Sequence, residues 1–149
     1  MSVEVPRVTR VSAYAVCVDP EDRLLLCRIA PGSTIVDDGN WTLPGGGLDH
    51  GEDPRDGALR ELAEETGYLG ELGELLAVDS WARRLRERDG SATDYHGIRI
   101  LYRCRVVGGE LRVETDGSTD DARWFTREEL RTTPVVDLVR VAVERIGVA

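Results

Sequence analysis

The sequence predicts an α/β protein with a mixed β-sheet, because β-type and helical segments intermingle along the chain. Alternating apolar and polar residues mark the strands, and a capped helical pattern covers residues 54–66. At 149 residues the chain has the length of one domain with a sizeable core. No internal repeat, low-complexity tract or linker divides it, so we expect residues 1–149 to form a single domain.

The first predicted elements are two β segments, at residues 11–18 and 23–29. The four residues between them, Asp-Pro-Glu-Asp, are typical of a turn and favour a hairpin. Residues 31–40 are polar and predict a loop. The stretch WTLPGGG, residues 41–47, predicts a short extended piece that ends in a glycine-rich turn.

The clearest helical pattern is that of residues 54–66. Asp53 is a suitable N-cap, a proline occupies the first helical position, and Gly67 is a suitable terminator. Ala58 and Leu62 lie four residues apart and predict the buried stripe of this helix.

The second half of the chain predicts more strands and a closing helix. The β-type runs are LLAVDSW, HGIRILYRCRVV and ARWF, at residues 75–81, 96–107 and 122–125. Thr126 and Glu129 have the spacing of a capping box, which predicts a helix start. Residues 135–146 predict an amphipathic helix.

Composition narrows the classes of function. The net charge of −9 disfavours sequence-independent binding of long nucleic acids. It is compatible with a small phosphorylated ligand that local charges and a metal hold. No apolar run has membrane-spanning length, and the first ten residues lack the apolar core of a secretory signal. We therefore expect a cytoplasmic protein with no membrane partner. Cys17, Cys27 and Cys104 lie in apolar runs without metal-ligand spacing and are expected to be buried free thiols.

The predicted helix 54–66 carries three glutamates on about one side, namely Glu61, Glu64 and Glu65. Like charges at these spacings destabilise an isolated helix by roughly a few tenths of a kcal/mol per pair. One interpretation is a solvated acidic face. The glycines at 45–47 favour another, because they let the backbone approach a ligand closely. Carboxylates with a carbonyl and water suit Mg²⁺ or Mn²⁺, which diphosphate chemistry requires.

Residues 46–68 resemble the Nudix box, G-x5-E-x7-R-E-U-x-E-E-x-G-U, in which U is a bulky hydrophobic residue. Every fixed position is filled, by Gly46, Glu52, Arg60, Glu61, Leu62, Glu64, Glu65, Gly67 and Tyr68. The chain is similar to this family more loosely in WTLPGGGL before the box and in the strand and ARWF-x-x-EEL after it.

The resemblance implies a fold, a reaction and a metal. Nudix proteins are α/β/α sandwiches around a mixed sheet, and most hydrolyse a nucleoside diphosphate linked to another moiety. The resemblance implies that Glu61, Glu64 and Glu65 face Mg²⁺ or Mn²⁺, together with the carbonyl of Gly45. An activated water would attack one phosphorus atom, with Glu61 or Glu64 as the base; these two alternatives stay open.

Further roles follow from the same resemblance. Glu52 and Arg60 would form an ion pair that braces the loop against the helix. Arg28 would contact substrate phosphate, although a solvated strand-end arginine is an equal alternative. A further metal ligand or base would come from a turn-rich segment with three candidate acids, Asp116, Asp120 and Asp121, for which turn formation alone is the alternative explanation.

The substrate is left open between nucleoside triphosphates and nucleotide sugars. Residues 81–97 carry four arginines and predict either a flexible loop that gathers polyphosphate or a solvated connector. Base stacking would fall to one of three tryptophans, Trp41, Trp81 or Trp124, or to a tyrosine. A Nudix-like domain that binds nucleotide without turnover is the competing hypothesis, but such domains usually lose box glutamates. The oligomeric state is left open, with a homodimer as one option.

Overall fold

The computed structural model describes residues 4–32 and 39–147, and within these ranges the chain forms seven strands and three helices. In chain order the elements are β1 (Arg7–Cys17), β2 (Leu24–Ile29), β3 (Trp41–Thr42), β4 (Gly45–Gly47), α1 (Pro54–Thr66), β5 (Tyr68–Arg86), β6 (Ala92–Gly109), β7 (Thr119–Phe125), α2 (Arg127–Leu130) and α3 (Asp137–Ile146). No helix in the described ranges is long and apolar enough to cross a membrane.

The strands form two sheets. The larger sheet has the order β4-β1-β6-β5 and is mixed, because β1 runs parallel to β6 while the other neighbours are antiparallel. The smaller sheet has the order β3-β2-β7 and is antiparallel. The predicted α/β class with a mixed sheet is confirmed.

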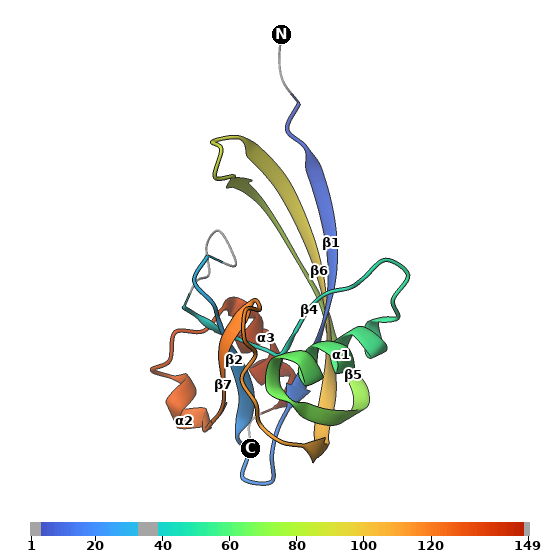
Figure 1. Ribbon diagram of the computed structural model, residues 1–149, viewed down its shortest axis with the longest axis vertical. Coiled ribbons are helices and arrows are strands. Elements are labelled where there is room, and N and C mark those ends of the chain that lie inside the picture. The colour runs from blue at the N-terminus through green and yellow to red at the C-terminus, as the bar shows by residue number, and fades with distance from the viewer. Residues whose placement is uncertain (1–3, 33–38, 148–149) are drawn as a thin grey trace.

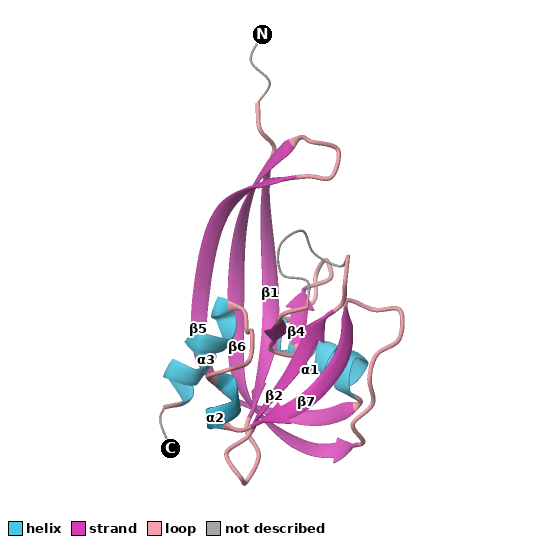
Figure 2. Ribbon diagram, turned by 90° about the vertical axis from the view of Figure 1, so that its left-hand side faces the viewer, coloured by secondary structure: helices cyan, strands magenta, loops and turns pink. Residues whose placement is uncertain are grey.

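Helices cover both faces of the larger sheet in the body of the molecule (Figure 1 and Figure 2). Neighbouring residues of β1 point to opposite faces. Ala15 packs in a cluster with Leu62 of α1, whereas Val16 packs in a cluster with Leu138 of α3. The second cluster also holds apolar residues of the smaller sheet, such as Leu24. The result is an α/β/α sandwich whose core lies on both sides of β1 and β6.

The expected hairpin between the first two strands is wrong. Only Val18 and Leu24 form a bridge, and β1 and β2 then separate into different sheets. The turn itself forms, since Asp19 accepts a hydrogen bond of 2.8 Å from the backbone N–H of Arg23. On one edge β1 pairs with β4 at Ser12–Tyr14, and β2 pairs with β3 and β7 in the smaller sheet.

The expected glycine-rich turn at residues 45–47 is also wrong. These glycines form β4, which pairs antiparallel with β1 in the register Ala13 to Gly46 and Tyr14 to Gly45. Gly45 has φ +150°, and a Cβ there would lie 2.3 Å from the carbonyl oxygen of Ala13. The lack of a side chain therefore allows this strand to lie tightly against β1.

Helix α1 forms with the predicted ends. The side chain of Asp53 caps it by accepting a hydrogen bond of 2.8 Å from the N–H of Arg55. Gly67 ends it in the left-handed conformation, with φ 78°, and donates its N–H to the carbonyl of Ala63. The predicted stripe of Ala58 and Leu62 is fully buried.

Residues 81–97 form neither a flexible loop nor a solvated connector. They belong to the long β5–β6 hairpin, in which Trp81 pairs with Gly97 and Arg86 with Ala92, so only residues 87–91 turn. Arg84 and Asp94 lie directly opposite and form an ion pair of 2.7 Å, a cross-strand contact that supports the sheet. The hairpin and the first part of β1 extend beyond the body of the molecule (Figure 1).

Candidate active site

The acidic residues of α1 meet the glycines of β4. Glu65 is 1% exposed, and its carboxylate accepts a hydrogen bond of 2.9 Å from the N–H of Gly45. Glu61 lies over the next glycine, since a Cβ on Gly46 would be 3.2 Å from Glu61 Oε1. The two carboxylates are thus held side by side at the edge of the larger sheet.

This arrangement shifts the pKa of the Glu65 carboxyl. Burial raises the pKa of the Glu65 carboxyl well above its ordinary value, and the charge of Glu61 raises it further. The hydrogen bond from Gly45 opposes the shift but does not reverse it. Among the described residues, no arginine forms an ion pair with Glu65. Ionised Glu65 is therefore a buried charge that no arginine of the described residues neutralises.

Glu64 lies on the solvent side of the same helix. Its side chain is 49% exposed and contacts Nη1 of Arg60 at 3.3 Å. Glu61, by contrast, is 16% exposed and contacts the same Nη1 at 3.1 Å. The structure brings Glu61 and Glu65 together, whereas Glu64 stands outside this pair.

Arg60 joins the loop before α1 to the helix. Its Nε and Nη2 donate to the two carboxylate oxygens of Glu52 at 2.8 and 2.9 Å. Nη2 also approaches the carbonyl of Gly47 at 3.4 Å. The guanidinium lowers the pKa of Glu52 to about 2, with help from the N–H of Asp49. This bidentate pair fixes the loop that carries the glycines against the helix that carries the glutamates.

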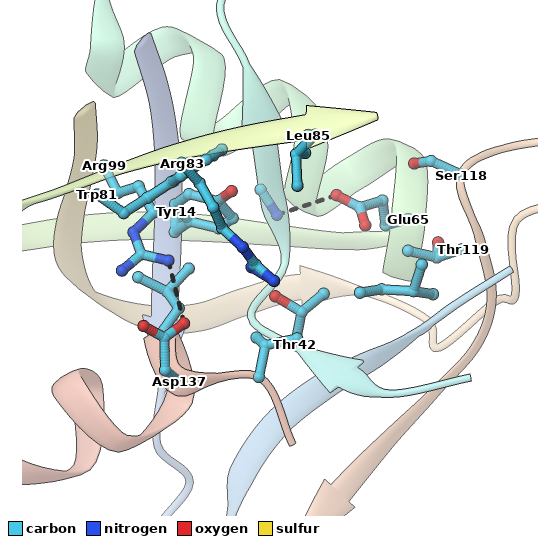
Figure 3. A pocket seen from close by; sticks show the side chains of 14 residues that line it. Tyr14, Thr42, Glu65, Trp81, Arg83, Leu85, Arg99, Ser118, Thr119 and Asp137 are labelled. Carbon is cyan, nitrogen blue, oxygen red and sulfur yellow. Dashed lines mark hydrogen bonds and ion pairs between the residues drawn. The ribbon is translucent and has the colours of Figure 1, made fainter. Parts of the chain in front are cut away.

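A cavity of about 440 Å³ opens beside Glu65 and Gly45 (Figure 3). Its size is that of a small-ligand site. Three strands and a helix contribute further wall residues, among them Thr42, Trp81, Arg83, Leu85, Arg99 and Asp137.

The part of the cavity wall formed by β6 and α3 holds an ion-pair network. Arg99 is 11% exposed and pairs with Asp79 of the neighbouring strand, with an Nε–Oδ2 distance of 2.9 Å. Its Nη1 also contacts Asp137, the first residue of α3, at 3.3 Å. These contacts attach α3 to the larger sheet and neutralise Arg99.

Arg28 and the predicted downstream acids lie outside the lining of this cavity. Arg28 donates from Nε to Asp120 at 2.7 Å. Asp121 accepts from its neighbours Ala122 and Arg123. Asp116 occupies a turn with φ 58°. The structure places the aspartates in turn and cross-strand contacts and does not bring them to the glutamate pair.

The three tryptophans have different surroundings. Trp41 is buried and packs edge-on against Phe125 in the core, with ring centroids 4.9 Å apart. The indole N–H of Trp124 donates to the hydroxyl of Tyr68 at 3.1 Å. Trp81 is the tryptophan that lines the cavity.

Sequence reasoning missed Glu114. Its charge contributes to the raised pKa of Glu65, and its carboxylate accepts a hydrogen bond of 3.1 Å from the hydroxyl of Thr119. It stands two residues before Asp116, at the start of the same turn-rich segment. Acids in that segment look alike in sequence, and only the fold shows which of them affects α1.

A family model described as NUDIX domain matches residues 8–144, so the chain belongs to the NUDIX family and the resemblance of the box is confirmed. The chain is a Nudix hydrolase by its relatives as well. It is 31% identical over 128 residues to a nucleoside triphosphatase NudI from Enterobacter sp. (strain 638), covering 83% of this chain and 86% of that one. It is 34% identical over 116 residues to an RNA pyrophosphohydrolase from Cereibacter sphaeroides, covering 71% and 70%.

Solved structures agree with the fold. A MutT NUDIX hydrolase from Burkholderia pseudomallei superposes with a TM-score of 0.74 at 27% identity, covering 94% of this chain and 99% of that one. A NUDIX hydrolase from Nitrosomonas europaea superposes with a TM-score of 0.73 at 23% identity, covering 93% and 88%. The second likeness concerns the fold alone.

Proposed function

We propose that this chain hydrolyses a phosphoanhydride bond of a nucleoside triphosphate in the presence of Mg²⁺ or Mn²⁺. The observation that carries the proposal is the buried Glu65 carboxylate, held beside Glu61 at the edge of a 440 Å³ cavity. A buried carboxylate without a counter-ion destabilises a fold, so its presence beside a cavity favours a role with a cation.

The residues fit a divalent cation of the hard, oxygen-binding kind. In the described residues no ready-made group of three or more acidic, histidine or cysteine side chains surrounds a metal position, yet the donor set is oxygen only. Glu61 and Glu65 would hold the ion, with Glu64 and the carbonyl of Gly45 as further ligands. The bound ion supplies charge neutralisation at phosphate and lowers the pKa of a water nucleophile.

The chain's own residues position the reactants. Arg60 holds Glu61 from one side at 3.1 Å and fixes the glycine-bearing loop through Glu52. Glu61 and Glu64 are the two candidates for the base that takes the proton of the attacking water. Glu64 is the more accessible to solvent water, whereas Glu61 is the closer to Glu65.

The cavity supports a small nucleotide as substrate. Its volume suits one nucleoside, and Trp81 offers an aromatic wall for a base. The relative named nucleoside triphosphatase, at 31% identity, favours a triphosphate over a nucleotide sugar. All fixed glutamates of the box are present, which favours turnover over silent binding.

The test is a panel of nucleoside triphosphates and nucleotide sugars, each assayed with Mg²⁺ and with Mn²⁺. Phosphate and pyrophosphate release are scored separately, because they report which anhydride bond breaks. We expect turnover of at least one triphosphate, and loss of that turnover in Glu61→Gln and Glu65→Gln. The variant Glu144→Gln, altered at an exposed position of α3, is the matched control. Nucleotide binding without release of any product would support the silent domain instead.

A further inference from the structure

Arg83 extends from β5 into the cavity and has no partner there. Figure 3 shows its side chain reaching toward Thr42, and the residue lines the same space as Glu65. Within residues 4–32 and 39–147 its guanidinium makes no hydrogen bond and no ion pair. The second arginine of the wall, Arg99, is neutralised by Asp79 and Asp137. Arg83 is therefore the cation of the described lining that is left uncompensated.

The neighbouring arginines of the hairpin are engaged elsewhere. Arg84 donates from Nε and Nη2 to the two carboxylate oxygens of Asp94, at 2.7 and 3.0 Å. Arg86 donates to the carbonyl of Gly90 at 2.8 Å. Arg88 donates to the carbonyl of Gly32 at 2.9 Å. Each of these three contributes to the hairpin or to its contacts, and Arg83 does not.

Strand alternation explains why Arg83 faces the cavity and its neighbour Arg84 does not. Side chains two residues apart along a strand share a face, and Trp81, Arg83 and Leu85 all line the cavity. Arg84 lies between two of them and points to the opposite face, where Asp94 meets it. The position of Arg83 is thus set by the register of β5 and does not depend on a loop.

An unpaired guanidinium in this place fits an anion. The chain carries a net charge of −9, and Glu65 lines the same cavity as Arg83. A polyphosphate therefore needs a local cation to enter this cavity. A guanidinium offers a planar fork of donors that matches two phosphate oxygens. Because no carboxylate in the described part of the chain pairs with Arg83, binding an anion there breaks no ion pair among these residues.

We propose that Arg83 binds a phosphate group of the substrate in the cavity that Glu65 of α1 also lines. The proposal rests on the proposed function in taking this anion to be the phosphate chain of a nucleotide. It makes Arg83 a substrate-binding residue outside the box, supplied by the β5–β6 hairpin. Arg28, which Asp120 already neutralises, is the weaker candidate for the same role.

The direct test is equilibrium binding of inorganic pyrophosphate, first in EDTA and then with Mg²⁺. Arg83→Gln is compared with Arg84→Gln, which removes the adjacent arginine from the opposite face. We expect wild type and Arg84→Gln to bind alike, and Arg83→Gln to bind roughly 10-fold more weakly in both media, as for a lost charged hydrogen bond. Equal affinities of the two variants, or no binding by wild type in either medium, would overturn the proposal.

A second readout separates a contact from a change in the fold. The Nε–Hε NMR resonance of Arg83, assigned by its absence in Arg83→Lys, should shift on adding pyrophosphate, while that of Arg84 stays in place. In turnover of a triphosphate, Arg83→Gln should raise KM more than it lowers kcat, and Arg83→Lys should recover part of the loss. An unmoved Arg83 resonance refutes the contact. If pyrophosphate binding needs Arg83 but no nucleotide is hydrolysed, the phosphate contact stands and the proposed function fails.

Discussion

The carboxylate of Glu65 and the backbone N–H of Gly45 are joined by a hydrogen bond of 2.9 Å that links helix α1 to strand β4. This contact fixes a charged group in a buried position at the edge of the cavity. It also places the carboxylate beside Glu61, whose charge opposes its ionisation.

Glu65→Gln is expected to raise the stability of the metal-free protein at neutral and alkaline pH. The amide keeps an acceptor for Gly45 and offers Glu61 a donor. In wild type the pKa of Glu65 is raised above its ordinary 4.5, so the folded state binds the proton more tightly than the unfolded state. Stability should therefore fall as pH rises from about 4.5 through the raised pKa of the folded state. Urea unfolding in EDTA at a series of pH values measures this slope.

The matched control is Glu64→Gln, because Glu64 lies on the same helix but is half exposed. Its stability profile should follow that of wild type, whereas the profile of Glu65→Gln should be flatter. Equal slopes in all three proteins would show that burial does not penalise the charge of Glu65. Turnover should fall about 100-fold or more in Glu65→Gln, since even outer partners of metal ligands contribute roughly 10- to 100-fold.

Acid should destabilise the protein through the pair of Glu52 and Arg60. The pKa of Glu52 is lowered from 4.5 to about 2, so its ionised form stabilises the folded state above pH 4.5. That contribution is lost as pH falls from 4.5 to about 2. Glu52→Gln should lack this part of the acid transition. Unfolding monitored by circular dichroism between these two pH values tests it, and an unchanged acid transition in the variant contradicts the pairing.

A double-mutant cycle tests whether Glu52 and Arg60 act together. Arg60→Ala leaves Glu52 without its bidentate partner and releases the carbonyl of Gly47. Stability should fall, and metal affinity should weaken roughly 10- to 100-fold, as for other residues that orient ligands. The double variant Glu52→Ala/Arg60→Ala should lose less than the sum of the two single losses. Strict additivity in both measurements would mean that the two residues do not brace the site.

Gly46→Ala tests the close approach of Glu61 to β4. The added methyl would stand 3.2 Å from Glu61 Oε1, so the carboxylate must move by a few tenths of an ångström. A shift of this size should lower turnover by roughly 10-fold, since a misplacement of about 1 Å costs on the order of 100-fold. Gly73→Ala is the control, because its methyl would meet its nearest atom at an ordinary 3.7 Å. Wild-type turnover in Gly46→Ala would show that this approach is not needed.

Helix α1 could be predicted from the sequence because its determinants are local. Asp53, the proline after it and Gly67 set its ends without help from the rest of the chain. The pairing of the strands could not be predicted in the same way. Strand β2 pairs with β3 and β7 and not with β1, and β7 is distant from β2 in sequence. The glycines of β4 likewise look like a turn until β1 is available to pair with them.

The box predicts which glutamates matter but not how they differ. Glu64 and Glu65 are adjacent and chemically identical, yet one is half exposed and the other is buried against Gly45. The difference arises from the docking of α1 on the larger sheet. Arg83 and Arg84 show the same limit, because their opposite orientations follow from the register of a strand where the sequence predicted a flexible loop or a solvated connector.

Binding of Mn²⁺, followed by the loss of the free-ion signal in electron paramagnetic resonance, tests whether the crowded glutamates of α1 hold a divalent cation. Wild type and Glu144→Gln should bind Mn²⁺ with equal affinity, and Mg²⁺ should compete. Glu61→Gln and Glu65→Gln should each bind at least about 10-fold more weakly while keeping the wild-type circular dichroism spectrum. Equal Mn²⁺ affinity in all four proteins, or no binding by wild type, would contradict the account.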